Sequence, residues 1–246
     1  MEQAVTFHSQ GQLIVANLGL PYAGAPCIIM SHGLESSKDG DKWLSLAPRL
    51  YAAGFAYLRF SYRGCGQGEG CSQGSFENTT LSGRVQDYRA AIDFVETAAV
   101  AKKGLGVVAS SFGGTVAIAA GDTRIKAMVT MATPCRFEAP TEEQLKMYQT
   151  RGFFDLPSGR RLRTGFWYDV KRLDVCNAVA RINCPLLIIH GSADKTVPVA
   201  DVHQLYEKAN TIKRLEIIEG GNHGFDNPAH LEQVIGLTLD WFKKYL

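Results

Sequence analysis

The stretch of sequence that decides the fold reads Leu105-Gly106-Val107-Val108-Ala109-Ser110-Ser111-Phe112-Gly113-Gly114. It joins a short apolar run of strand type to the start of a helical pattern. A nucleophile on so sharp a strand-to-helix turn needs small residues two places before it and two places after it. Ser111 has Ala109 and Gly113 at these places, whereas Ser110 would have the larger Val and Phe. The register therefore predicts Ser111 at the tip of the turn. Taken alone, the stretch also fits an ordinary junction in which Ser111 caps the helix.

Short apolar runs alternate with helical patterns along the rest of the chain. Runs this short and apolar are typical of strands covered on both faces, and they lie at 27–30, 56–60, 105–109, 127–131, 186–189 and 215–218. Helical patterns lie at 43–53, 81–95 and 202–209, and a last helix begins after Asn227 as N-cap and Pro228 at the first helical position. Residues 5–7 and 13–15 predict an antiparallel hairpin at the sheet edge. The alternation predicts an α/β fold with a mostly parallel, eight-stranded sheet and helices on both faces.

The domain organisation is predicted from the length of the chain and from one interruption in the alternation of strand and helix patterns. A chain of 246 residues suits one α/β domain, so we expect a single domain over residues 1–246. Residues 134–181 show no clear strand and two possible short helices. This stretch is too long for an ordinary connection, and long insertions are often lids. We therefore predict a short cap over residues 134–181, inserted after the sixth strand.

Composition excludes several classes of partner. Apolar residues make up 46% of the chain and charged residues 20%, which predicts a folded core. Lys plus Arg number 26 against 24 Asp plus Glu, so there is no electrostatic reason to expect nucleic acid or an anionic membrane surface. No apolar run approaches the roughly 18–20 residues that span a bilayer, and the N-terminal sequence does not resemble a secretory signal. These features predict a cytoplasmic protein, and none of them indicates an oligomeric state.

The cysteines and glycines give no reason to expect a metal or a cofactor. None of the six cysteines forms a Cys-x-x-Cys pair or has zinc-finger spacing to a histidine. We expect them to be reduced, with a Cys65–Cys71 bridge as the alternative. Residues 104–109 match the dinucleotide spacing Gly-x-Gly-x-x-Ala, but they precede and form a strand instead of following one.

Two later loops supply the partners that a serine nucleophile needs, a base and an acid that orients it. Asp194 follows the run at 186–189, and His223 follows the run at 215–218 among glycines. Loops at the carboxyl ends of parallel strands open on the same edge, so we expect Ser111, Asp194 and His223 to meet there. Asp226 is the rival acid, but it falls at the start of the last helix.

An oxyanion hole needs two backbone N–H groups near the nucleophile. One is predicted to be that of Phe112, which directly follows Ser111. The other is predicted to be that of Leu34, in the loop Ser31-His32-Gly33-Leu34, where Gly33 allows the bend. His32 precedes this glycine, which favours a structural role or a role in the oxyanion loop over a role as base.

Aromatic side chains stand out in the predicted cap at Phe153, Phe154, Phe166, Trp167 and Tyr168. One hypothesis is that some of them, together with Gly33, form a pocket for an acyl or aryl group. The other is that they fix the cap to the body. Residues 136–181 hold nine Lys or Arg against six Asp or Glu, a local charge of +3 that fits either a substrate with a free carboxylate or a solvated helix face.

With these motifs, the chain resembles the α/β-hydrolase superfamily over essentially its whole length. The motifs that carry the resemblance are His32-Gly33-Leu34, Arg63-Gly64-Cys65-Gly66, Ala109-Ser110-Ser111-Phe112-Gly113-Gly114, His190-Gly191-Ser192-Ala193-Asp194 and Asn222-His223-Gly224. The order Ser…Asp…His is also the one that this fold uses. Two departures are Ala109, where glycine is commoner, and Ser61-Tyr62, where many relatives carry an Asp.

Within the superfamily, the chain is similar to bacterial carboxylesterases of the cinnamoyl (feruloyl) esterase type, with serine-aminopeptidase-like and dienelactone-hydrolase-like groups close by. The resemblance implies a serine carboxylesterase that acts on small acyl or aryl esters through an acyl-enzyme, with no metal and no cofactor. A peptidase or thioesterase with the same triad is the alternative among enzymes. A non-catalytic binding scaffold is the alternative of another class.

Overall fold

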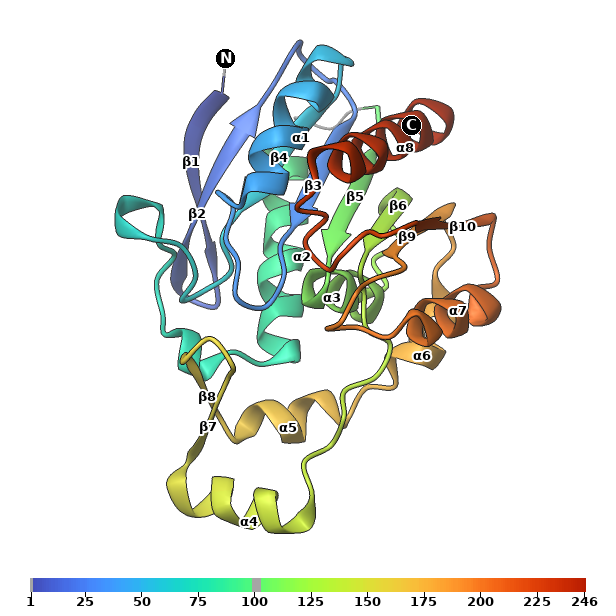
Figure 1. Ribbon diagram of the computed structural model, residues 1–246. Helices are drawn as coiled ribbons and strands as arrows, with labels where there is room; N and C mark the ends of the chain where they lie inside the picture. The colour runs from blue at the N-terminus through green and yellow to red at the C-terminus, as the bar shows by residue number, and fades with distance from the viewer. Residues whose placement is uncertain (1, 99–102) are drawn as a thin grey trace.

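A central sheet organises the protein, whose computed structural model describes residues 2–98 and 103–246 (Figure 1). In these residues the sheet has eight strands in the order β1-β2-β4-β3-β5-β6-β9-β10. Their bounds are β1 Glu2–Ser9, β2 Gln12–Gly19, β3 Cys27–Ser31, β4 Ala56–Phe60, β5 Leu105–Ser110, β6 Ile125–Met131, β9 Leu186–Gly191 and β10 Lys213–Ile218. The hairpin β1–β2 and the pair β2–β4 are antiparallel, and the other pairs are parallel. The predicted α/β fold is confirmed.

Helices cover both faces of this sheet because its central strands are apolar on both sides. Val108 and its neighbours pack with α1 (Asp41–Ala52) and α8 (Pro228–Tyr245) in one core. Val107, one residue earlier and so on the opposite face, belongs to a second core with α2 (Leu81–Thr97), α3 (Phe112–Ala120) and α7 (Val199–Lys208). The start of α8 is as predicted, since the Asn227 side chain accepts a hydrogen bond from the Ala229 N–H at 2.9 Å.

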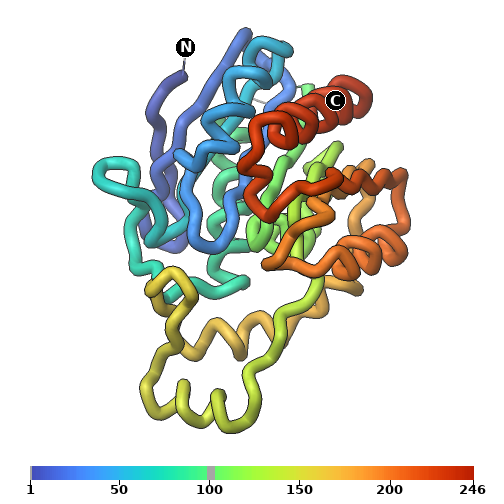
Figure 2. The backbone as a smooth tube through the Cα atoms, in the orientation of Figure 1, coloured from blue at the N-terminus to red at the C-terminus, as the bar shows by residue number. Residues whose placement is uncertain are grey.

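The segment 134–181 lies between β6 and β9 in the sequence, and its part with α4, β7, β8 and α5 lies beyond the end of the sheet to which β5 points (Figures 1 and 2). It contains α4 Glu142–Arg151, β7 Phe153–Asp155, β8 Arg161–Arg163, α5 Gly165–Val170, α6 Val175–Ala178 and the 3-10 turn η3 Val179–Arg181. The sequence shows no clear strand and two possible short helices here, whereas the structure has a small antiparallel hairpin, β7–β8, and the helices α4, α5 and α6. Strands of three residues are too short to show an alternating pattern in the sequence. We call residues 134–181 the cap segment. Two further 3-10 turns, η1 Gly68–Gly70 and η2 Phe76–Asn78, lie before α2.

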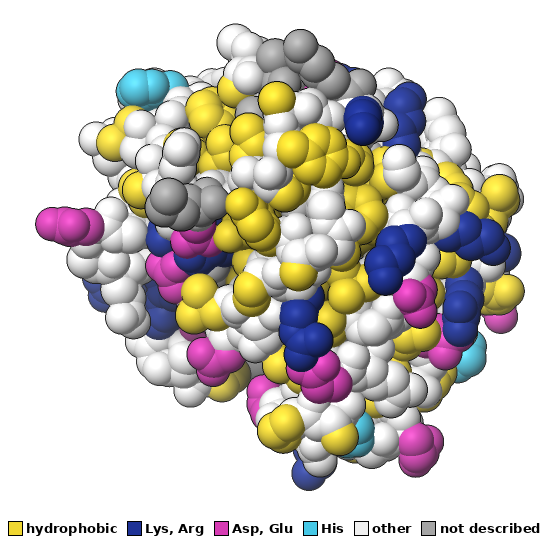
Figure 3. Space-filling view, turned by 90° about the horizontal axis from the view of Figure 1, so that it is seen from above, with side chains coloured by type: hydrophobic (Ala, Val, Ile, Leu, Met, Phe, Trp, Pro, Cys, Tyr) yellow, Lys and Arg dark blue, Asp and Glu magenta, His cyan; other side chains and the backbone are white. Residues whose placement is uncertain are grey.

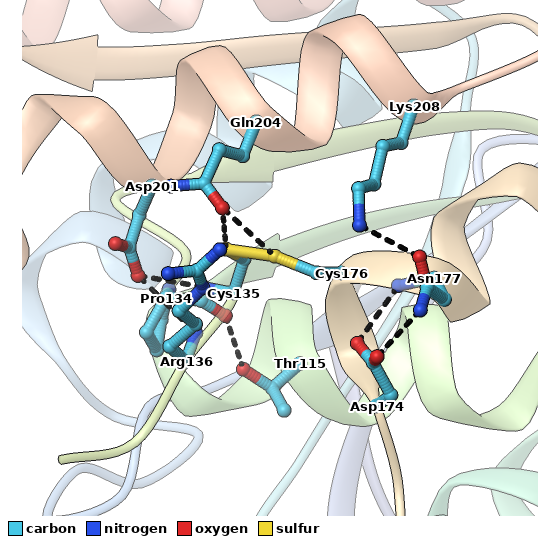
Figure 4. The surroundings of a disulfide bond; sticks show 10 residues. All are labelled: Thr115, Pro134, Cys135, Arg136, Asp174, Cys176, Asn177, Asp201, Gln204 and Lys208. Atoms are coloured by element: carbon cyan, nitrogen blue, oxygen red, sulfur yellow. Dashed lines mark hydrogen bonds between the residues drawn. A yellow bond between two sulfur atoms is a disulfide. The ribbon is translucent and has the colours of Figure 1, made fainter.

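A disulfide bond joins Cys135 to Cys176, near the two ends of the cap segment (Figure 4). Their Cα atoms lie 4.9 Å apart across a sequence separation of 41. The expectation that all six cysteines are reduced is therefore wrong for this pair. Cys65 and Cys71, the pair considered from the sequence, are both free. The tertiary fold brings Cys135 and Cys176 together, and no local spacing predicts such a contact.

Figure 3 shows the molecule from above, relative to the orientation of Figure 1. Hydrophobic, basic and acidic side chains are mixed on this face. This mixture agrees with the nearly balanced charge of the sequence. In the described residues, 2–98 and 103–246, no helix has both the length and the apolar character needed to cross a membrane.

Candidate active site

Ser111 occupies the sharp turn between β5 and α3 in an uncommon backbone conformation, with φ 54° and ψ −127°. A positive φ is strained for a residue other than glycine. The turn closes because two glycines follow. A Cβ atom at Gly113 would lie 2.3 Å from the carbonyl oxygen of Ser31, and one at Gly114 would lie 2.0 Å from Thr133 Oγ1. The structure thus places Ser111 at the tip of the turn, where the register predicts it.

Ser111, His223 and Asp194 form one hydrogen-bonded chain. His223 Nε2 lies 3.1 Å from Ser111 Oγ, and His223 Nδ1 lies 2.8 Å from Asp194 Oδ2. Because a carboxylate can only accept, Nδ1 carries the ring proton and Nε2 is left free to accept a proton from the serine. The three residues come from loops after β5, β9 and β10, which open on one edge of the sheet as expected.

The surroundings of Asp194 keep its carboxylate ionised. Its side chain is 0% exposed, whereas that of His223 is 29% exposed and can be reached from solvent. Burial alone would raise the pKa of Asp194, but hydrogen bonds from His223 and from the N–H groups of Thr196 and Val197 outweigh it and hold the pKa below its usual value. Asp226, the rival acid, instead accepts a hydrogen bond from the Asn222 side chain at 2.7 Å.

The loop that carries Leu34 is fixed from behind by His32. Burial, followed by the nearby Arg84 guanidinium, lowers the pKa of His32 to about 3, so the ring is neutral. Its Nε2 accepts a hydrogen bond from the Tyr62 N–H at 3.0 Å, so its Nδ1 donates to the Gly33 carbonyl at 2.8 Å. This geometry agrees with the structural role predicted for His32.

Arg84 on α2 holds the same loop, and the sequence reasoning missed it. Its side chain is 1% exposed and donates to the carbonyl oxygens of Gly33 at 3.0 Å and of Leu34 at 2.6 Å. In a trans peptide the C=O and N–H groups point in opposite directions. Since His32 and Arg84 both bind the Gly33 carbonyl, the Leu34 N–H of the same peptide is directed away from them. The sequence does contain one signal that Arg84 is buried. Arg84 lies three residues after Leu81 and four before Tyr88, which places a charged residue on the apolar face of its helix.

On the expectation from the sequence that the chain hydrolyses esters, replacing Arg84 by methionine should reduce kcat for this reaction by about 100-fold, the lower end of the loss seen when an oxyanion donor is removed. The neighbouring Arg89→Met is the matched control, because Arg89 is exposed on the same helix and donates to the Ala120 carbonyl. Activity and melting temperature should be measured for both variants. An Arg84→Met protein with wild-type kcat would contradict the role assigned to Arg84.

Phe112 provides the second predicted N–H group. It is the first residue of α3, where backbone N–H groups have no acceptor within the helix. Its ring is buried and lies under the Arg84 guanidinium, with 5.2 Å between Arg84 Cζ and the ring centroid. Leu34 and Phe112 both line the cleft that contains Ser111. Their proposed role as oxyanion donors remains a prediction.

An open cleft of about 1750 Å³ surrounds Ser111 and His223. Gly33 and Trp167 line it, as the pocket hypothesis expects, whereas Phe153, Phe154 and Phe166 are not among its lining residues. Phe154 and Phe166 are buried, and Phe166 contacts Phe112 with ring centroids 5.6 Å apart. These two side chains fit the other hypothesis, in which they fix the cap segment to the body. The sequence reasoning did not single out the cap residues Arg136, Phe137 and Pro157, which also line the cleft.

The chain belongs to the α/β-hydrolase family, whose family model matches residues 28–235. It is similar to the mitochondrial palmitoyl-protein thioesterase ABHD10 of Homo sapiens, with 26% identity over 188 residues. That match covers 71% of this chain and 58% of the relative, so the chain spans little more than half the length of that protein.

Two solved structures share the fold. Est1E from Butyrivibrio proteoclasticus with bound ferulic acid has a TM-score of 0.85 at 21% identity, and the match covers 98% of this chain and 99% of that chain. The α/β hydrolase GrgF from Penicillium sp. sh18 has a TM-score of 0.85 at 19% identity, covering 100% of this chain and 99% of that chain. Similarity at these identities concerns the fold.

Proposed function

We propose that this protein is a serine carboxylesterase that cleaves small acyl or aryl esters through a covalent acyl-enzyme. The observation that carries the proposal is the hydrogen-bonded chain Ser111–His223–Asp194, open to a cleft on its serine side. A nucleophile, a base with the correct tautomer and a buried acid are the groups that acyl transfer requires.

In the proposed reaction, His223 Nε2 takes the proton of Ser111 as its oxygen attacks the ester carbonyl. Asp194 stabilises the imidazolium that forms, and the Leu34 and Phe112 N–H groups bind the oxyanion. The imidazolium then protonates the departing alcohol. Water, deprotonated by His223, then attacks the acyl-enzyme. The bond between the acyl carbon and Ser111 Oγ breaks, His223 returns the proton to Ser111 Oγ, and the acid is released. Every step uses groups of this chain, and none requires a metal ion or an organic cofactor.

A thioester is the second candidate for the substrate, because the relative named above is a palmitoyl-protein thioesterase. The same triad could act on a thioester or, with a more demanding leaving group, on a peptide. The cleft of about 1750 Å³ exceeds the roughly 300–1,000 Å³ of many small-ligand sites, so it does not restrict the substrate to a short acyl chain.

The experiment that tests the proposal compares leaving groups on one acyl series. Acetyl through decanoyl groups are offered as 4-nitrophenyl esters, as N-acetylcysteamine thioesters and as 4-nitroanilides, and kcat/KM is measured for each. In parallel, wild-type protein is treated with a fluorophosphonate, and the labelled peptide is identified by mass spectrometry. We expect fastest turnover of esters and a label on Ser111. Faster thioester turnover would favour the second candidate, and an unlabelled, inactive protein would favour the binding scaffold.

A further inference from the structure

The side chain of Lys42 enters the cleft beside the nucleophile. Its Nζ donates a hydrogen bond to Ser110 Oγ at 2.9 Å, and Ser110 directly precedes Ser111. It also lies 5.1 Å from the centroid of the Phe225 ring, which belongs to the loop that follows β10 and carries His223. Lys42, Ser110 and Phe225 all line the cleft that holds Ser111 and His223.

Two features of this position are unfavourable for a cation. Lys42 is the second residue of α1, where the positive end of the helix dipole repels a positive charge. In the described part of the chain, its ammonium forms no ion pair within 4.0 Å, because its hydrogen-bond acceptor is a neutral hydroxyl. Asp226 and Asp194 are the carboxylates that act on it from further away. Lys42 is thus a partly buried cation that lies at an unfavourable helix end without an ion-pair partner. Such a departure from the usual preferences, at the edge of a candidate active site, indicates a functional group.

We propose that Lys42 binds a carboxylate of the substrate, so that the preferred substrates are esters that carry a second, ionised acid group. This inference rests on the proposed function, because it adds a specificity-determining residue to the same site. A charge-assisted hydrogen bond to the ammonium would supply the anionic partner that the chain itself does not place within ion-pair distance of Lys42.

The kinetic test uses pairs of esters that differ by one charge. Mono-4-nitrophenyl esters of adipic, suberic and sebacic acid are compared with their methyl esters, and 4-acetoxybenzoate is compared with methyl 4-acetoxybenzoate. The measured quantity is the ratio of kcat/KM for the anionic member to that for the neutral member. We expect Lys42→Met to lower this ratio by about 10- to 100-fold, and Lys42→Arg to restore part of it.

Lys195→Met is the matched control, because Lys195 is an exposed cation that lines the same cleft. If the preference for anionic esters came from the general positive charge around the cleft, removing either lysine would lower the ratio by a similar factor. This result would overturn the proposal. The proposal is also overturned if wild-type protein shows no preference for the anionic member of any pair.

The pH dependence of the same ratio provides a second readout. Burial lowers the pKa of Lys42 to about 8, while Asp226 and Asp194 act against this shift. The ammonium is therefore mostly charged at pH 7 and mostly neutral at pH 9. We expect the anionic preference to decline as the pH rises through about 8 in wild-type protein and to stay flat in Lys42→Met. A flat ratio in wild-type protein would count against Lys42 as the anion-binding group.

Binding without turnover separates this inference from the proposed function. Calorimetry on the Ser111→Ala protein compares monomethyl adipate, which carries a carboxylate, with dimethyl adipate. Tighter binding of the monoester that is lost in Ser111→Ala/Lys42→Met supports the carboxylate site even if the wild-type protein cleaves no ester. Equal binding of the two probes contradicts it even if ester cleavage is fast.

Discussion

Ser111→Ala should lower kcat for 4-nitrophenyl ester hydrolysis by about 10⁶-fold, the loss typical when a triad serine is removed. The reason is that Ser111 Oγ is the hydroxyl aligned with His223 Nε2 at 3.1 Å. The rate that remains should come from binding and from the oxyanion donors alone. The measurement is initial velocity with high enzyme concentration, together with fluorophosphonate labelling of the variant.

The control for this loss is Ser75→Ala. Ser75 is exposed, its side chain forms no cap hydrogen bond with the turn that follows, and it is not among the cleft residues. Ser75→Ala should retain wild-type activity, and both variants should melt near the wild-type temperature. If Ser111→Ala kept more than a few per cent of the activity, the nucleophile would be another group. Ser110, whose hydroxyl contacts Lys42, would be the first to examine.

Asp194→Asn should reduce kcat by about 10⁴-fold. An asparagine amide placed where Asp194 Oδ2 lies would donate to His223 Nδ1 and stabilise the wrong tautomer, in which Nε2 bears the proton and cannot accept one from Ser111. Because the pKa of Asp194 is below its usual value, the wild-type carboxylate stays ionised from mildly acidic pH upward. The wild-type rate should therefore not depend on Asp194 titration near neutral pH.

Asp226→Asn tests the rival assignment in the same assay. Asp226 pairs with Asn222 within its own loop, so its replacement should reduce kcat by less than about tenfold. Steady-state kinetics of the two variants at pH 7 decide between the acids. A larger loss for Asp226→Asn than for Asp194→Asn would reverse their roles.

The sequence allowed the fold and the loop order to be predicted because both leave local signals. Apolar runs mark the buried strands, and the small residues around Ser111 mark the sharp turn. The meeting of Asp194 and His223 with Ser111 could be predicted because each follows a predicted strand. The loops at the carboxyl ends of parallel strands lie at one edge of the sheet. Their geometry agrees with the prediction, while their catalytic role awaits the variants described above.

The features that were missed depend on contacts between distant segments. Arg84 reaches a loop about 50 residues earlier, and Cys135 reaches Cys176 across the cap segment. In the sequence, Phe154, Phe166 and Trp167 are equally good candidates for lining a pocket. Only the packing of the folded chain shows that Phe154 and Phe166 are buried and that Trp167 lines the cleft. Lys42 is a single charged residue at the start of a helix, and nothing in the local pattern indicates that it enters the cleft.

The backbone of Ser111 also has a consequence for evolution. At φ 54° a serine is strained by about 1–3 kcal/mol, a large part of the stability of a typical domain. Under the proposed function, selection for catalysis would retain a side chain there. In a descendant that lost its need for the reaction, glycine at this position would relieve the strain and be favoured by selection for stability alone. Loss of the nucleophile would then be an early step, taken while the other loops of the site still look intact.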